Sequence, residues 1–166
     1  DEKYKSVKLS FKANIESPSV TYSMPYGFIE KVANGEEEPC HAWCDLHNES
    51  GMGLSLLNTS KYSFCAIEND LRMMIARSCA YLDHYGQKKR DGEMEFLDKG
   101  EQEFTYEIVP HANDIKSDLF KMAELLNSPL QTHQETHHDG TLPQTYSALT
   151  VDKSNIVVTS LKSAED

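Results

Sequence analysis

Short segments in which apolar and polar residues alternate recur along this chain, and they constrain its fold more than any other feature. In the first of them Val7, Leu9 and Phe11 fall on one face, with Lys8, Ser10 and Lys12 on the other. A period of two residues is typical of a β-strand with one buried face. By this pattern we predict strands over 7–12, 19–31 with a break at 25–27, 41–46, 52–57, 62–67, 71–76, 103–109, 146–151 and 155–161.

Turn and loop signals separate these segments. Asn34-Gly35 predicts a turn, and the acidic triplet 36–38 that follows predicts a solvated loop closed by Pro39. Residues 152–154 join the last two predicted strands as a hairpin. Two longer loops are expected over 79–100 and 131–145, and the first is long enough to be either functional or partly disordered.

One segment has the period of an α-helix. Its apolar positions form one stripe, made of Ile115, Leu119, Met122, Ala123 and Leu126. Asn113 or Asp114 can cap its start, and Asn127 with Pro129 ends it. Many short strands with a single helix predict an all-β fold, an antiparallel β-sandwich with one short helix, formed as one domain by residues 1–166.

Charge and composition exclude several classes of partner. The chain has 166 residues, a formal net charge of −11 and a sequence pI near 5.0, which argues against a nucleic-acid backbone or an anionic membrane as the main partner. No apolar run approaches the length of a membrane span, and no signal-peptide pattern opens the chain. Because residue 1 is Asp, we interpret the chain as a processed product or a piece of something longer. A cytoplasmic location is expected, since no export signal is seen.

No catalytic motif stands out. We interpret the four cysteines as reduced and mostly buried, because the domain is of ordinary size and has no export signal. Cys40-x3-Cys44 is disfavoured as a metal site, because no second ligand pair follows it. His133 and His137 have the spacing of a zinc-protease helix, but their glutamate is one position too late, so a solvated loop is favoured. Trp43 has a face that suits a sugar ring, although a buried Trp is the commoner case. Residue chemistry alone thus indicates an acidic antiparallel β domain without a visible catalytic centre.

A set of short stretches, taken in order, adds a family resemblance. They lie at 25–30, 34–39, 43–46, 53–58, 60–62, 71–78, 98–106, 110–111 and 125–130. Together they resemble the C-terminal β region of glycoside hydrolase family 38 α-mannosidases, most closely the bacterial and cytosolic branch. The resemblance implies a supersandwich-like β domain. Thr59 and Ser63 depart from the aspartate and glycine that the family usually has at these positions.

The resemblance implies a chemistry that this chain does not itself carry. Family enzymes hydrolyse α-mannosides with retention, using a zinc ion and two carboxyl groups of an N-terminal catalytic domain. No part of the 166 residues matches that domain, so no catalytic residue and no metal ligand is assigned here, and the isolated chain is expected to be inactive. The expected partners are the chain's own N-terminal catalytic domain and mannose-containing glycans, without nucleic acid or membrane. A homo-oligomer is kept among the partners to be tested.

One turn is the candidate substrate-binding element. Asn58, Lys61 and Tyr62 place an amide, an ammonium and a hydroxyl group on a tight turn, and such groups can hydrogen-bond adjacent sugar hydroxyls. The competing interpretation is that Asn58 and Lys61 only satisfy the turn between two strands. A weaker candidate for the same surface is the loop over 90–100. A stand-alone carbohydrate-binding module and a purely structural interface domain are the alternative functions.

Overall fold

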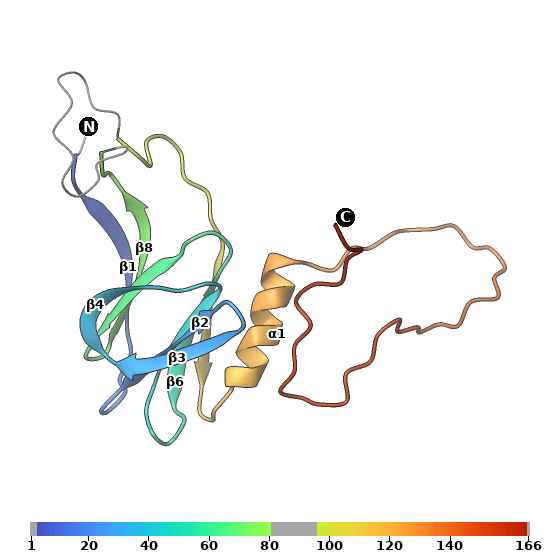
Figure 1. Ribbon diagram of the computed structural model, residues 1–166, viewed down its shortest axis with the longest axis horizontal. Helices are drawn as coiled ribbons and strands as arrows, with labels where there is room; N and C mark the ends of the chain where they lie inside the picture. Colours follow the sequence, from blue (N-terminus) through green and yellow to red (C-terminus); the bar gives the residue numbers. More distant parts are fainter. Residues whose placement is uncertain (1–2, 81–95, 166) are drawn as a thin grey trace.

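Two antiparallel β-sheets packed face to face form the body of the protein (Figure 1). The computed structural model describes residues 3–80 and 96–165. Its elements are β1 Ser6–Lys12, β2 Ser19–Met24, β3 Gly27–Val32, β4 Asn34–Pro39, β5 Trp43–His47, β6 Gly53–Asn58, β7 Ser63–Ile67, β8 Asp70–Arg77, β9 Tyr106–His111 and the helix α1 Lys116–Asn127. One sheet has the order β1-β8-β7-β4 and the other β3-β2-β5-β6-β9. The predicted antiparallel β-sandwich with one short helix is confirmed.

The main core lies between the two sheets. Tyr22 on β2 packs against Phe64 on β7, with ring centroids 4.9 Å apart. The inward side chains of β5 and β6 complete this layer, among them Cys44, Leu46 and Leu56, all fully buried. Because side chains alternate along a strand, the intervening residues of β5 and β6 face outward, towards α1.

Helix α1 covers part of that outer face. Leu119 and Ala123 on α1 pack against Trp43 on β5 and Leu57 on β6 in a second, smaller apolar cluster. The predicted cap at Asn113 or Asp114 is wrong, because the N-cap residue is Ile115 and no side chain caps the helix. The side chain of Asp114 does accept a hydrogen bond from the backbone N–H of Lys116, N···O 3.0 Å, and so satisfies one donor at the start of the helix. The helix ends at Asn127, as predicted.

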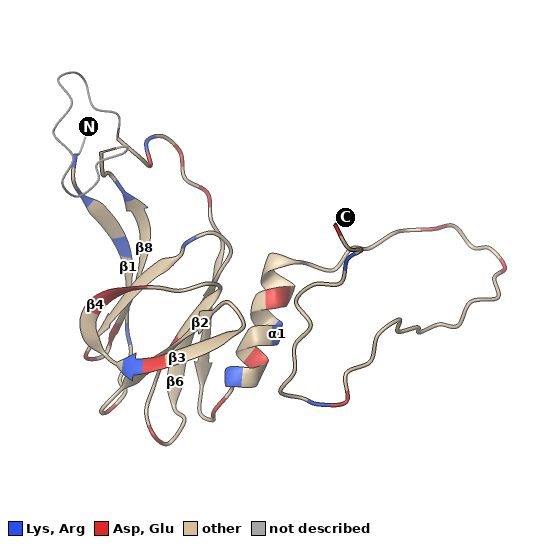
Figure 2. Cartoon of the chain, in the orientation of Figure 1, with Lys and Arg blue, Asp and Glu red and all other residues tan. Residues whose placement is uncertain are grey.

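The segment predicted as a turn and acidic loop is instead the edge strand β4. It pairs with β7, and the register shifts between Asn34 and Glu37, where Gly35 has a positive φ of 84°. The acidic side chains, drawn red along β4 in Figure 2, stay at the surface. Glu37 pairs with Lys8 of β1, and Glu38 with Lys31 of β3, so these charges are accommodated on a strand without being buried.

The strand predicted over 103–109 is shifted towards its C-terminal end. β9 begins at Tyr106 and continues through Pro110 to His111. Pro110 was expected to end it, but β9 is an edge strand that pairs only with β6, and edge strands tolerate proline.

The prediction of two strands, over 146–151 and 155–161, is wrong. This part of the chain has no regular secondary structure, and Figure 1 shows it looping away from the sandwich beyond α1. Alternation makes a strand only where a neighbouring strand supplies hydrogen bonds, and this segment pairs with no strand among the described residues. The predicted loop over 131–145 is confirmed as irregular and exposed. Most of the predicted loop over 79–100 lies outside the described residues.

Candidate functional site

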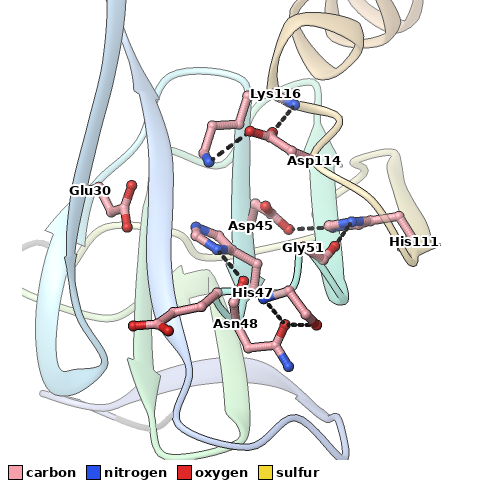
Figure 3. Close-up of a pocket in the computed structure, with 10 residues that line it drawn as sticks. Glu30, Asp45, His47, Asn48, Gly51, His111, Asp114 and Lys116 are labelled. Carbon is pink, nitrogen blue, oxygen red and sulfur yellow. Dashed lines mark hydrogen bonds and ion pairs between the residues drawn. The ribbon is translucent and has the colours of Figure 1, made fainter.

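A polar cavity of about 330 Å³ opens on the outer face of the five-stranded sheet, beside the start of α1 (Figure 3). It is lined by Glu30, Asp45, His47, Asn48, Glu49, Ser50, Gly51, His111, Asp114 and Lys116. These residues come from β3, from β5 and the turn after it, from the end of β9, and from the beginning of α1.

Strand register brings the polar groups of this cavity into one row. Asp45 on β5 lies opposite Thr21 on β2 and opposite Ser55 on β6. All three side chains face outward, on the same side of the sheet as Trp43. Helix α1 packs over Trp43, and the row of polar side chains lies beside the first turn of the helix. Thr21, Asp45 and Ser55 are nonetheless at most 2% exposed, so each polar group needs a partner within the protein.

The side chain of Asp45 has hydrogen-bond partners on β6 and β9, the next two strands in the sheet. The hydroxyl of Ser55 donates to Asp45 Oδ1, with an O···O distance of 2.8 Å. Nε2 of His111 lies 2.8 Å from the same oxygen, and the two side chains of this pair are 2% and 6% exposed. The carboxylate is therefore buried with a hydrogen-bonded partner on each side, which offsets the cost of removing it from water.

His111 links the sheet to the two segments that cover it. Its Nδ1 lies 2.9 Å from the carbonyl oxygen of Gly51, in the turn after β5, and 2.8 Å from that of Asn113, just before α1. The ring lies directly on Gly53, where an added Cβ would come within 2.5 Å of ring atoms. The imidazole is thus fixed by contacts on both sides.

His47 and Asn48 shape the other wall of the cavity. Nε2 of His47 lies 2.8 Å from the hydroxyl oxygen of Thr21. Oδ1 of Asn48 accepts hydrogen bonds from the backbone N–H groups of Ser50 and Met52, each at 3.1 Å, and this closes the turn between β5 and β6.

Asp114 contributes a carboxylate at the rim. Its pKa is lowered, chiefly because it accepts the hydrogen bond from the backbone N–H of Lys116, and partial burial opposes this only in part. The Lys116 ammonium group and His47 lower the pKa further. Asp114 is therefore a carboxylate at neutral pH, paired with the ammonium group of Lys116.

This cavity combines donors and acceptors but holds no activated nucleophile. Its two histidines and its buried carboxylate are already bound to protein partners. The sequence analysis missed it because Asp45, Ser55 and His111 are far apart along the chain and meet only through strand register. The signal that was present is a charged residue and a histidine on the outward positions of β5, an otherwise apolar strand.

The predicted substrate-binding turn lies at the opposite end of β6 from Gly53. Asn58 is buried, and its Oδ1 accepts a hydrogen bond from the backbone N–H of Lys61 at 2.8 Å, so it shapes the turn. The ammonium of Lys61 lies 5.2 Å from the ring centroid of Phe104 and 3.4 Å from Oε1 of Gln102. Tyr62 is 59% exposed. The structure thus brings Lys61 and Tyr62 to the surface, with Asn58 beneath them.

The tryptophan and the cysteines belong to the interior. Trp43 is fully buried, which confirms the core interpretation and removes it as a sugar-stacking surface. The four cysteines are free thiols, and all except Cys79 are buried, as predicted. A hydrogen bond with Cys40, together with burial, raises the pKa of the Cys44 thiol well above its ordinary value. The Cys44 thiol is therefore not prepared for nucleophilic or metal chemistry.

The residues that the structure describes contain neither a cluster of metal ligands nor a membrane-spanning helix. Among residues 3–80 and 96–165, no three His, Cys, Asp or Glu side chains converge as ligands for a metal ion. Within the same ranges, no helix has the length and apolar character needed to cross a membrane.

A comparison with known protein families shows which family the chain belongs to. The family described as "Glycosyl hydrolases family 38 C-terminal domain" matches residues 1–85, half of the chain, including β5, β6 and the turn at Lys61. The chain belongs to this family. The resemblance seen in the sequence is thereby confirmed.

Relatives extend the match beyond residue 85. Alpha-mannosidase 2C1 of Mus musculus is 30% identical over 174 residues, and the human protein of the same name is 28% identical over 174 residues; both alignments cover 99% of this chain. Alpha-mannosidase G of Dictyostelium discoideum is 27% identical over 182 residues and covers the whole chain. The chain spans only 15% of the length of each of these relatives.

Proposed function

We propose that this chain is the non-catalytic β-sandwich of an α-mannosidase, and that it packs against a catalytic domain elsewhere in the longer protein. The observation that carries the proposal is the family match over residues 1–85, since the matched relatives are named α-mannosidases. The small share of those relatives that the chain spans supports the existence of a larger parent. Its four free thiols support a cytoplasmic location.

Apolar side chains left in solvent support a packing role. Leu130, Leu142 and Leu161, all in the segment after α1, are more than 80% exposed. Exposed apolar residues gathered in one part of a protein usually mark an interface. We propose that the catalytic domain covers this segment in the complete enzyme.

The catalytic groups are proposed to lie in the other domain. Retaining hydrolysis needs two carboxyl groups on either side of the glycosidic bond. Asp45, the buried carboxylate of the cavity, is already bound by Ser55 and His111. We therefore assign the hydrolysis of α-mannosides, and any zinc ion, to residues outside this chain, and expect the purified chain not to cleave mannosides.

The turn at Lys61 is proposed to complete the sugar site. Lys61 and Tyr62 present donors at the surface, and the contact of the ammonium with Phe104 and Gln102 limits its freedom before a ligand arrives. A hydrogen bond from an ammonium to a sugar hydroxyl contributes about 1.5–3 kcal/mol. Asn58 acts through the turn it holds in place.

The test is Lys61→Ala in the complete α-mannosidase that carries this chain. We expect kcat/KM for an α-mannoside to fall about 10- to 100-fold, the equivalent of that hydrogen bond. Lys12→Ala is the control, because Lys12 is exposed at the end of β1, in the other sheet and outside the segment after α1. An unchanged kcat/KM in a correctly folded Lys61→Ala enzyme would remove the turn from the sugar site and leave the family assignment intact.

A stand-alone carbohydrate-binding module is the second candidate, and the exposure of Tyr62 beside Lys61 is the observation in its favour. The two proposals differ in what the isolated chain does. Titration of the chain with mannobiose, followed by NMR, should leave the Tyr62 ring signals in place if the site needs the catalytic domain. Saturable shifts of those signals would instead support a module that binds sugar alone.

A further inference from the structure

A second cavity, of about 360 Å³, adjoins the polar one and has an aromatic lining. It is lined by Phe28, Asp114, Lys116, Ser117, Phe120 and Asn155. Because Asp114 and Lys116 line both cavities, the two meet at these residues and form one groove. We call it the outer groove, since it follows the outer face of the five-stranded sheet beside α1. It has a polar end at Asp45 and an aromatic end at Phe28.

Strand register places an aromatic ring and a carboxylate side by side in this groove. On β3, Glu30 lies opposite Thr21 of β2, which faces outward. Side chains alternate along a strand, so Phe28, two residues earlier, faces outward as well. Its side chain is 50% exposed, and its ring centroid lies 6.4 Å from that of Phe120 on α1. Residues two apart on a strand are separated by about 7 Å, a spacing that one pyranose ring can bridge.

The carboxylates of the polar end exclude an anionic ligand. The side chains of Glu30 and Glu49 line it, and neither has a hydrogen-bond or ion-pair partner among the described residues. Asp45 is buried beneath them. A phosphate or other anion would be repelled by these groups.

The middle of the groove disfavours a cation. The ammonium group of Lys116 lies where the two cavities meet, 3.4 Å from Oδ2 of Asp114. A positively charged ligand that spans the groove would face this ammonium. The free carboxylates can only accept hydrogen bonds, so the fitting ligand is neutral and rich in hydroxyl donors.

We propose that the outer groove binds a neutral oligosaccharide, with one sugar ring stacked on Phe28 and its hydroxyl groups donating to Glu30. The apolar face of a pyranose suits an aromatic ring, and a carboxylate can accept from two neighbouring hydroxyls. A few placed polar groups beside an aromatic surface are typical of small-ligand sites. None of the residues that line the groove belongs to the turn at Lys61, so this is a second sugar site.

The choice of sugar rests on the proposed function, because the matched relatives are named α-mannosidases. The probe is therefore mannobiose, added to the purified chain and followed by NMR. We expect saturable shifts of the ring signals of Phe28 and Phe120, while those of Tyr62 stay in place. Inorganic phosphate should leave the Phe28 signals unchanged.

Variants on β3 test the two contacts separately. Phe28→Leu keeps an apolar side chain but removes the flat ring, and we expect mannobiose to bind about 10-fold more weakly. Glu30→Gln removes the charge of the acceptor and should weaken binding by about 3- to 10-fold. Ile29→Val is the matched control and should bind as the wild type does, since Ile29 lies opposite Tyr22, whose ring packs in the core between the sheets.

The wild-type titration decides the proposal even if a variant does not fold. Phe28 and Phe120 signals that stay in place in excess mannobiose would overturn the groove as a sugar site. So would shifts confined to Tyr62, or shifts of Phe28 caused by phosphate or by tetralysine and not by mannobiose. These outcomes leave the proposed function untouched. Conversely, a complete enzyme that cleaves no α-mannoside would refute the proposed function, whereas saturable Phe28 shifts would still support the groove.

Discussion

At the scale of single residues, Gly53 has no space for a side chain. A Cβ at this position would lie 2.5 Å from two ring atoms of His111 and 2.8 Å from the carbonyl oxygen of Leu46. The ring cannot move aside easily, because both of its nitrogens are bound to protein oxygens. The absence of a side chain is therefore what allows the His111 ring to lie on β6.

We predict that Gly53→Ala lowers the free energy of unfolding by about 1–3 kcal/mol, the usual cost of overpacking. Urea denaturation of the full chain measures it. Gly140→Ala is the control, since no atom lies within 4 Å of a Cβ built at Gly140, and its stability should stay within about 0.5 kcal/mol of wild type. Equal stability of the two variants would show that the ring does not occupy this position.

At the scale of the elements, α1 is attached to the sandwich by few side chains. Its buried residues are Leu119 and Ala123, and it packs mainly on β6 and β5. Helices of this length owe most of their stability to such packing and little to intrinsic propensity. The helix should therefore loosen before the sheets do.

Leu119→Ala tests this dependence. We predict that this substitution makes the docking of α1 on the sheet less favourable by about 2–5 kcal/mol, because Leu119 is fully buried. Amide hydrogen exchange should rise along α1 while β5 and β2 keep their protection. Leu125→Ala, which removes a half-exposed side chain from the same helix, should change exchange little. A uniform rise over helix and sheets would contradict separate loosening of α1.

At the scale of the whole molecule, the chain divides into a folded sandwich with α1 and a long exposed segment after it (Figure 1). The segment contains apolar residues suited to strands, but it pairs with no strand among the described residues. Its contribution to the stability of the isolated sandwich is expected to be small. In the proposed complete enzyme it would gain partners.

Deletion of residues 131–166 measures that contribution. We predict that the thermal midpoint of the shortened chain stays within about 2 °C of the full chain, a change in stability below about 0.5 kcal/mol. We also predict that binding of a hydrophobic dye decreases, because exposed apolar side chains are removed. A large drop in the midpoint would show that the segment packs on the sandwich after all.

The sequence by itself determined the features that depend on near neighbours. The alternation around Leu9 predicted β1, the stripe through Leu119 predicted α1, and the short motifs predicted the family. Each of these depends on residues a few positions apart, where the spacing of side chains directly reflects the local backbone. The burial of Trp43 was expected on a different ground, because a large apolar ring is more often buried than exposed.

The tertiary structure decided everything that depends on which strands become neighbours. β4 forms because β7 supplies its ladder hydrogen bonds, with Lys8 and Lys31 pairing two of its glutamates, and 146–161 stays irregular because it pairs with no strand among the described residues. The contact between Asp45 and His111 joins residues 66 positions apart, and it exists only in the register that places β6 between β5 and β9. Hydrogen-bond pairing across a sheet is non-local, and no local pattern in the chain encodes it.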